Sequence, residues 1–357
     1  MNKPLVSIVI NNYNYGRFLG EAIDSALNQN YPHKEVIVVD DGSTDDSREI
    51  IAKYGNRIIP VLKENGGQAS AFNAGFVVSK GDIIIFLDAD DILLPGAAQE
   101  VVSIWEPKLS KVQWRLQLVD EKLRLLPDTW PSKWQSMPSG DLRPMVLRWR
   151  HYPCPPTSGN AFSRWLLERI LPMPEEEWRI AADPYLLSLA ALYGEVQSID
   201  KVLGYYRIHG RNLWYDEGQN IRKLIQMVKT GDAQKRLLEH AAHNLGLNFE
   251  GRLIPLGSKV ELALAVLAPQ ELKALGKSTN RLWIAFNGIR ASLVWPYFPN
   301  LWARIRLLMW FALVASLPHS LARRLTLLGM FPAARPPWLA RLLRVAEKLS
   351  PQGGPYG

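Results

Sequence analysis

The stretch IIIFLDADD, residues 83–91, decides the fold. It joins a short run of β-branched and aromatic residues to three carboxylates within four positions. Apolar runs of this length that end abruptly in polar residues are typical of buried strands, so we expect a strand over 83–87. Three acids this close together repel one another unless a cation neutralises them. The stretch therefore predicts a buried strand that presents an acidic site at its carboxyl end.

The sequence before this strand alternates between strand and helix patterns. Three more short apolar runs lie at residues 5–10 (LVSIVI), 35–39 (EVIVV) and 58–62 (IIPVL). Apolar residues recur at helical spacing over about 18–27 and 68–79, and Ser43 or Thr44 is placed to cap a further helix. Such alternation predicts a mostly parallel sheet with right-handed crossovers. Farther along, residues 161–199 look helical, with a helix at 185–193.

The composition excludes several classes of protein. The chain has 357 residues, 47% apolar and 21% charged, which suggests about two domains and excludes wholesale disorder. The single Cys154 excludes a disulfide scaffold and fits a reducing compartment. No stretch has the ~18 consecutive apolar residues of a membrane span, and the N-terminus carries no export signal. The phosphate-binding glycine motifs of dinucleotide dehydrogenases and P-loop enzymes are absent.

Polar side chains follow three of the predicted strands. They are Asn11-Asn12-Tyr13-Asn14, Asp40-Asp41 and Asp88-Ala89-Asp90-Asp91. Parallel strands bring their carboxyl ends to one edge of a sheet, where such sheets bind ligands. Asp88 and Asp90 lie two residues apart, so extended backbone projects both carboxylates to the same side. These positions predict one convergent site with the hard oxygen ligands that a divalent cation prefers.

Four ordered segments carry a resemblance to a known family. They are SIVINNYNYGRFLGEAIDSALNQNYP (7–32), VVDDGSTDDS (38–47), NGGQASAFNAGF (65–76) and GDIIIFLDADD (81–91). The chain resembles bacterial, non-processive family-2 glycosyltransferases with the GT-A fold. The resemblance is strong over about 5–95 and continues more weakly to about 212, through SGNAF, AADPYL and YYRIHGRN.

The resemblance implies an α/β, Rossmann-like GT-A fold: a mixed, mostly parallel sheet flanked by helices, with a C-terminal helical extension. Residues 1–100 would form the nucleotide-sugar-binding half and 101–215 the acceptor-binding and catalytic half. Residues 216–357 would form a helical C-terminal region.

The resemblance also implies roles on the donor side. Asn11 and Tyr13 would frame a slot for the nucleotide base, and Asp40 would accept its imide proton. The alternative is that Asp40 only caps the turn at Ser43. Asp88 would lie near the ribose, and Asp90, in the D-x-D motif, would ligate Mn²⁺ or Mg²⁺ bound to the diphosphate of a nucleotide sugar, expected to be UDP-linked.

The catalytic base would be Asp183 of AADPYL, with Glu177 as the substitute candidate. The alternative for Asp183 is an N-cap, because Asp followed by Pro suits the start of a helix. Arg207 and His209 would close over the diphosphate, or else form a salt-bridged strand end.

Two departures from the family pattern concern phosphate binding and processivity. Phe72 stands where many relatives have Arg, so one phosphate contact is missing unless Lys63 or the Arg207–His209 pair compensates. Processive synthases carry Q-x-x-R-W, whereas the nearest match here, Gln219-x-x-Arg222-Lys223, lacks the Trp. Single-sugar transfer is the better interpretation.

Aromatic and basic residues suggest two further surfaces. Trp130, Trp134 and Trp149 could stack on acceptor sugar rings or simply pack in the core. From Arg281 onward, ten basic residues face one acid, Glu347. Residues 301–317 are too short an apolar run to span a bilayer, and 338–349 are basic and amphipathic. About 281–349 are therefore expected to lie on an anionic membrane, the alternative being a helical subdomain over the catalytic core.

Together these inferences predict a metal-dependent inverting transfer of a sugar to a hydroxyl of a glycan or lipid-linked glycan, in cell-surface polysaccharide synthesis. The protein would be cytoplasmic and peripheral to the inner face of the cytoplasmic membrane. A nucleic-acid partner is not expected, because residues before Arg281 are slightly acidic overall. The alternatives are a non-catalytic relative that acts as a membrane scaffold, and nucleotidyl transfer to a sugar phosphate.

Overall fold

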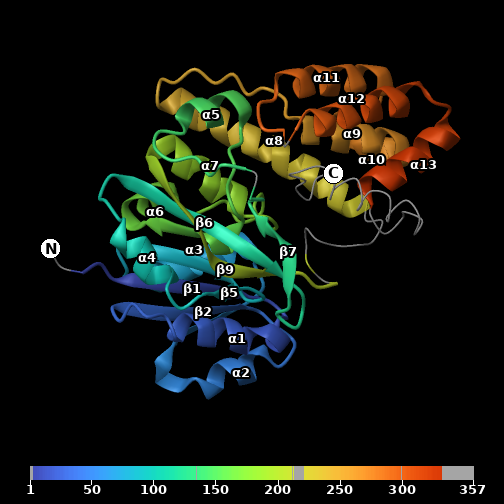
Figure 1. Cartoon of the computed structure of the whole chain (residues 1–357). Coiled ribbons are helices and arrows are strands. Elements are labelled where there is room, and N and C mark those ends of the chain that lie inside the picture. Colours follow the sequence, from blue (N-terminus) through green and yellow to red (C-terminus); the bar gives the residue numbers. More distant parts are fainter. Residues whose placement is uncertain (1–2, 134, 211, 213–220, 299, 332–357) are drawn as a thin grey trace. The chain divides into compact units, whose positions relative to one another are not determined.

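The computed structural model describes residues 3–331 except 134, 211, 213–220 and 299 (Figure 1). Two compact units divide the chain. The first comprises residues 1–131, 136–208 and 240–248, and the second comprises residues 132–135, 209–239 and 249–357. Each unit has its own hydrophobic core.

The first unit alternates strands and helices. Its elements are β1 (Val6–Asn12), α1 (Gly16–Leu27), β2 (Lys34–Asp41), α2 (Ser47–Lys53), η1 (Gly55–Arg57), β3 (Ile59–Lys63), α3 (Gln68–Val78), β4 (Ile83–Asp88), β5 (Ile92–Leu93), α4 (Ala97–Ser103), β6 (Leu109–Val119), β7 (Leu125–Trp130), α5 (Arg143–Trp149), η2 (Thr157–Gly159), β8 (Asn160–Ser163), α6 (Arg164–Ile170), α7 (Asp183–Tyr193) and β9 (Glu195–Arg207). The four strands predicted before residue 91 are confirmed as β1 to β4.

The strands of the described residues form one mixed sheet. Its order is β3-β2-β1-β4-β8-β6-β9-β5, and β7 pairs with β6. The first four strands of this order are parallel to one another. β8 runs antiparallel to both of its neighbours, and β9 runs parallel to β6. The predicted mixed α/β sheet flanked by helices is confirmed, and its first four strands in this order are the parallel part.

Side chains on both faces of β1 and β2 are buried, which explains why these two strands have few polar residues. Ile8, Ile10 and Val38 share a core with the apolar residues of α1. On the opposite face α3 approaches so closely that a Cβ on Gly75 would lie 2.3 Å from Val9 Cγ1. α1 and α3 therefore cover opposite faces of the parallel strands (Figure 1).

Two predictions on local structure are wrong. Neither Ser43 nor Thr44 caps a helix, because α2 begins only at Ser47. Both residues instead bond to the loop after β1: Ser43 Oγ accepts from Asn14 N at 2.9 Å, and Thr44 N donates to Asn14 Oδ1 at 2.7 Å. Residues 161–199 are not helical throughout, since β8 and the start of β9 lie in this segment. Pairing with β4 and β6 overrides their local pattern.

The second unit is helical. It holds α9 (Pro255–Leu267), α10 (Pro269–Ala274), α11 (Arg281–Val294), α12 (Leu301–Ser316) and α13 (His319–Met330), while α8 (Ile221–Asn244) is divided between the units. Its core gathers apolar residues from these helices, Phe311 and Leu262 among them. Of the helices in the described part of the chain, none is both long and apolar enough to cross a bilayer. The amphipathic segment predicted at 338–349 lies outside the described residues.

Candidate active site

The side chains of the last two residues of β1 hydrogen-bond to the two strands on either side of it. Asn11 lies level with Asp88 of β4, and Asn12 lies level with Asp40 of β2. Asn11 Nδ2 donates to Asp88 Oδ1 at 2.8 Å, and Asn12 Nδ2 donates to Asp40 Oδ1 at 3.0 Å. The Oδ1 atom of Asn11 is buried and has no hydrogen-bond donor among the described residues. The strand ends thus converge as predicted, with a buried acceptor beside Asp88.

Asp40 and Asp41 are both buried and engaged by internal donors. Asp40 Oδ2 accepts from Ser43 N at 3.1 Å and from Arg48 Nε at 2.8 Å. The first of these bonds is the turn-capping contact that sequence analysis gave as the alternative for Asp40. Asp41 binds the loop before α3 through the backbone N–H groups of Gly66 and Gly67. Both carboxylates therefore hold the loops that follow β2 and β3.

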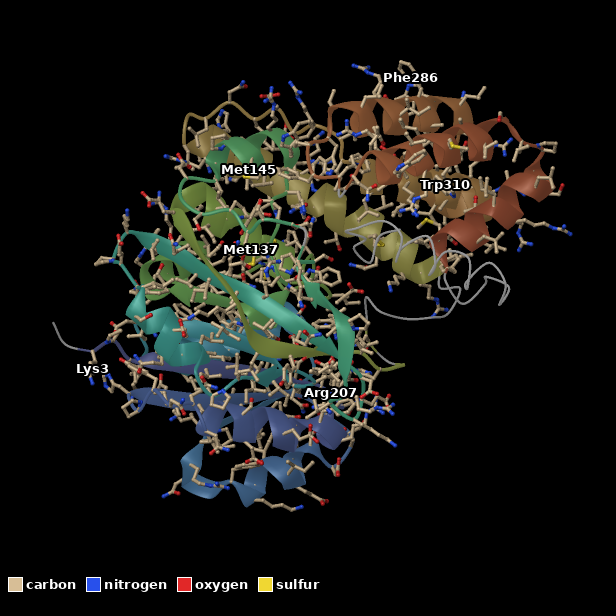
Figure 2. The ribbon with its side chains drawn as sticks, viewed as in Figure 1. Lys3, Met137, Met145, Arg207, Phe286 and Trp310 are labelled. Atoms are coloured by element: carbon tan, nitrogen blue, oxygen red, sulfur yellow. The ribbon has the colours of Figure 1, made fainter. Side chains whose placement is uncertain are left out.

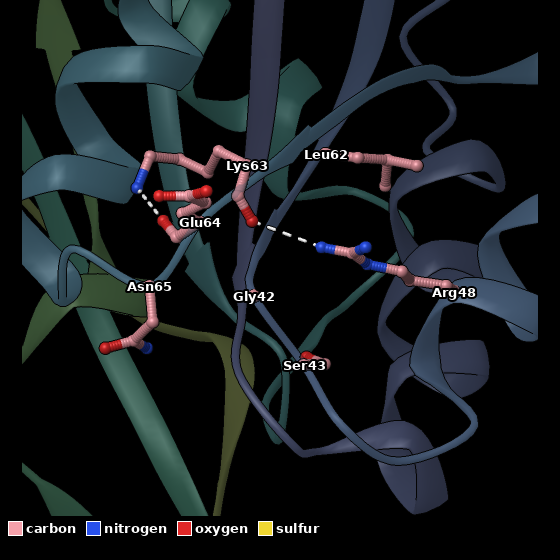
Figure 3. A pocket seen from close by; sticks show the side chains of 7 residues that line it. All are labelled: Gly42, Ser43, Arg48, Leu62, Lys63, Glu64 and Asn65. Atoms are coloured by element: carbon pink, nitrogen blue, oxygen red, sulfur yellow. Dashed lines mark hydrogen bonds between the residues drawn. The ribbon is translucent and has the colours of Figure 1, made fainter.

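A shallow groove borders this turn. It measures about 590 Å³ and is lined by Gly42, Ser43, Arg48, Leu62, Lys63, Glu64 and Asn65 (Figure 3). Lys63 does not project freely into it, since its Nζ lies 2.7 Å from Asp41 Oδ1 and donates to the carbonyl of Glu64. The groove is therefore polar and pre-shaped by hydrogen bonds.

The loop from Asp88 to Asp91 is fixed by residues from η2 and β9, which follow it in the chain. Ser158 Oγ accepts from Asp88 N at 3.1 Å and donates to Asp91 Oδ2 at 2.6 Å. Arg207, at the end of β9, donates from its backbone N to Asp91 Oδ1 and from Nε to the carbonyl of Asp90, at 3.0 and 2.9 Å. The D-x-D loop is thus held by residues about 70 and about 117 positions away in the chain.

Gln68 links the D-x-D loop to Asp183. Its Nε2 lies 3.3 Å from Asp88 Oδ1, and its Oε1 accepts from Ala182 N at 2.9 Å. Asp183 is the first residue of α7, and Ala182 occupies the N-cap position, so Asp183 is not the cap. The preceding Ala181 adopts φ 61°, a left-handed conformation that is costly for alanine. Backbone strain and a glutamine bridge therefore set the position of Asp183.

The acids lie within electrostatic reach of one another. Burial and the charge of Asp90 raise the pKa of Asp88 to about 7, and Asp183 contributes to this shift. Burial raises the pKa of Asp183 itself to about 6. Burial, with the charges of Asp90 and Asp88, raises the pKa of Asp91 well above its usual value. Burial also raises the pKa of Tyr206, to which all four carboxylates contribute.

These residues fit a hard divalent cation whose remaining coordination positions are filled by a bound ligand. Carboxylates that repel one another, beside the orphaned Oδ1 of Asn11, are the oxygen donors that Mn²⁺ and Mg²⁺ accept. Within the described residues, no group of three or more His, Cys, Asp or Glu is arranged to hold a metal. A nucleotide diphosphate would have to supply the remaining ligands, as is usual for such cations at phosphate sites.

One predicted phosphate contact, Arg207, has other partners. The Arg207 guanidinium is buried, ion-paired to Glu21 and stacked 4.4 Å from the Phe18 ring centroid, which is the salt-bridged alternative. Phe72 is fully buried, and its ring lies 4.5 Å from that of Phe86 in the core. His209 belongs to the second unit, where its backbone bonds with Asn212.

The remaining predicted residues lie as follows. Tyr13 is 46% exposed, so its ring is accessible to the base of a nucleotide. Glu177 is exposed, and Asp183, not Glu177, is the acid whose charge raises the pKa of Asp88. Trp149 is buried, whereas Trp130 is half-buried with its ring 6.2 Å from Tyr206. Trp134 lies outside the described residues.

Four residues of this site were not predicted from the sequence. They are Tyr15, Gln68, Ser158 and Tyr206, all in or beside the quoted segments. Tyr15 belongs to the site because the charges of Asp90 and Asp88 reach it: burial and these two charges raise the pKa of its hydroxyl. Their place in the quoted segments could have marked these residues, but the sequence does not show which side chains they contact.

Comparison with known proteins identifies the family of the first part of the chain. The family model for glycosyl transferase family 2 matches residues 7–164. The chain carries a glycosyltransferase family 2 domain. It is 37% identical over 213 residues to an uncharacterized glycosyltransferase of Nostoc sp., and 48% identical over 99 residues to the chondroitin synthase of Pasteurella multocida.

The aligned segments account for only part of these relatives. The matches cover 66% of the Nostoc protein and 10% of the chondroitin synthase, and 58% and 27% of this chain. Among solved structures, S. aureus TarS 1–349 in complex with UDP-GlcNAc aligns over 90% of each chain, with 15% identity and a TM-score of 0.48.

Proposed function

We propose that this chain transfers a single sugar from a nucleotide diphosphate sugar to a hydroxyl of a glycan or lipid-linked glycan, with inversion at the anomeric carbon. The observation that carries the proposal is the Gln68 side chain, which bonds both to Asp88, inside the matched family 2 domain, and to the backbone N–H of Ala182, directly before Asp183. The polar groove beside Asp40 and the exposed Tyr13 would take the nucleoside, expected to be uridine.

Each carboxylate has a separate task in this proposal. Asp90 would hold Mn²⁺ or Mg²⁺, which when bound stabilises the departing diphosphate. Asp88, held by Asn11 and Gln68, would face the ribose. Asp183 would take the proton from the acceptor hydroxyl while that oxygen bonds to the anomeric carbon and the bond to the diphosphate oxygen breaks. A raised pKa makes Asp183 a stronger base than an exposed aspartate.

The remaining partners are also proposed. The acceptor would stack on Trp130, the partly exposed ring next to Tyr206. The arginine-rich helices of the second unit would hold the protein at the inner, anionic face of the cytoplasmic membrane, in the synthesis of a cell-surface polysaccharide.

The test is release of nucleoside diphosphate from a panel of nucleotide sugars by the full chain, with Mn²⁺ or Mg²⁺. Asp90→Asn and Asp183→Asn should each lower turnover by about 100-fold or more. Glu177→Gln, a matched control on an exposed acid, should retain activity. Undiminished turnover in both aspartate variants would overturn the proposal, and donor binding without turnover in the unmodified chain would select the non-catalytic alternative.

A further inference from the structure

The outer face of α11 is apolar where a surface helix is normally polar. Leu282, Trp283, Phe286, Leu293 and Val294 are each between 53% and 67% exposed. Their spacing of three, four and seven or eight residues places them along one side of the helix. The opposite side, with Ile284, Ala285 and Ala291, is buried in the core of the second unit. α11 therefore has two apolar sides, and only one of them is covered by the described residues.

The next helix repeats this pattern. Leu301, Trp302 and Met309 of α12 are 67%, 70% and 57% exposed, while Trp310 and Phe311 on its other side are buried. Figure 2 labels Phe286 on the outside of α11 and Trp310 among the helices. Exposed apolar surface of this extent is uncommon on monomeric soluble proteins and marks an interaction site.

The charge of these helices is of one sign. Residues 281–331 contain six arginines and no Asp, Glu or Lys. Arg281 and Arg304 donate to backbone carbonyls within the unit. The other four, Arg290, Arg306, Arg323 and Arg324, are exposed and form no ion pair with any described residue. Arg290 lies on the apolar face itself, with its guanidinium carbon 5.7 Å from the Phe286 ring centroid.

This charge decides among the possible occupants. A second copy of the chain docked through the same face would bring a second Arg290 to the contact, and like charges repel. The C-terminal residues 332–357 are also basic, with four basic residues and one acid. The occupant must be anionic and must also accept Trp, Phe and Leu side chains. Anionic phospholipid at a bilayer surface has both properties, and tryptophan favours that interface.

We infer that the outer face of α11, extended by the first turn of α12, inserts into the headgroup region of an anionic lipid bilayer. Leu282, Trp283 and Phe286 would enter the interface while Arg290 and Arg306 meet the lipid phosphates. The inference deepens the membrane association in the proposed function by assigning it to folded helices that precede residues 338–349.

The test is co-sedimentation of the full chain with vesicles of phosphatidylcholine alone, or with roughly 30% phosphatidylglycerol. The chain should bind the anionic vesicles and dissociate at high salt. The double variant Trp283→Ser/Phe286→Ser should bind about tenfold more weakly, because it loses two interfacial aromatic side chains. The matched control is Val77→Ser/Leu125→Ser, which removes exposed apolar residues of the first unit and should bind normally.

The outcomes separate this inference from the rest of the proposed function. If the chain binds anionic vesicles and the α11 variant binds equally well, the inference is wrong; loss in Arg341→Ala/Arg344→Ala would then assign the contact to 338–349. If the chain ignores both vesicles, or if it self-associates and the α11 variant does not, membrane docking by α11 is also overturned. Sugar transfer to a soluble acceptor stands or falls separately. Circular dichroism must show that each variant is folded.

Discussion

Arg207 Nε donates to the backbone carbonyl of Asp90 across 2.9 Å, although the two residues lie 117 positions apart. The same arginine pairs with Glu21 of α1 and donates to the carbonyl of Glu121. It therefore ties the D-x-D loop to both halves of the sheet domain. This places Arg207 as a positioning residue for the proposed metal ligand rather than as a contact to the diphosphate.

Replacing Arg207 should therefore weaken metal activation. Arg207→Lys keeps the charge but loses the planar fork that serves three acceptors at once, so the Asp90 loop should loosen. We expect the Mn²⁺ concentration for half-maximal activity to rise about tenfold, with the unfolding free energy lower by about 2 kcal/mol. Arg143→Lys, at an exposed ion pair, should change neither. A lower kcat at unchanged metal dependence would contradict the positioning role.

Gln68 is predicted to couple the two acids of the site. Gln68→Leu removes the donor to Asp88 and the acceptor for Ala182 N while keeping similar volume. Loss of both bonds should misplace Asp183, and a small displacement of a catalytic group is costly. We expect kcat to fall about tenfold or more at nearly unchanged KM for the donor. Gln226→Leu, whose side chain bonds only to Thr230 among the described contacts, is the matched control.

The sheet and the acidic site were predictable because their signals are local. The run over 83–87 is continuously apolar, and the run over 5–10 is apolar except for Ser7, since each strand is buried on both faces; the polar residues follow directly. β8 and β9 were not predicted, because pairing with β4 and β6 creates them. The partner of Arg207 was equally hidden, since a carbonyl 117 residues away leaves no pattern in the sequence.

The pH profile should report Asp183. Burial raises its pKa from 3.8 to about 6, and a base must be deprotonated to act. Below about pH 6 we therefore expect kcat/KM to fall about tenfold per pH unit, with a plateau above it. Asp183→Glu should keep a residual acidic limb, whereas Asp183→Asn should have almost no activity to titrate. A flat profile down to about pH 4.5 in the unmodified chain would assign the base elsewhere.

Ionised Asp88 should lower the unfolding free energy of the chain at alkaline pH. Its folded pKa, about 7, lies above its ordinary value of 3.8, so the folded state holds the proton more tightly. The unfavourable contribution is absent below about pH 4, grows as the pH rises and is complete above about pH 7. Asp88→Asn should thus raise the unfolding free energy at pH 8 by on the order of 1–3 kcal/mol, and hardly at pH 4.

Mn²⁺ separates this effect from a general gain in stability. A cation that relieves the repulsion at Asp88 and Asp90 should raise the melting temperature of the unmodified chain at pH 8. The Asp88→Asn variant should gain less from Mn²⁺. If Asp88→Asn stabilises the chain equally at pH 4 and pH 8, the charge of Asp88 is not the cause of the gain in stability.

Gly67 allows the loop before α3 to pass close to the backbone of Arg179. Its φ is +89°, and a Cβ at this position would lie 2.5 Å from the backbone oxygen of Arg179. Its N–H donates to Asp41 Oδ2 at 2.7 Å, which fixes the loop and the neighbouring Gln68. Gly67→Ala should therefore cost about 2–4 kcal/mol of unfolding free energy and reduce transfer, because Gln68 is displaced. Gly96→Ala, where φ is −89° and a Cβ would contact no atom within 4 Å, should be nearly neutral by the same thermal melt. Equal melting temperatures for the two variants would mean that the loop yields without disturbing Gln68, and transfer by Gly67→Ala should then be normal.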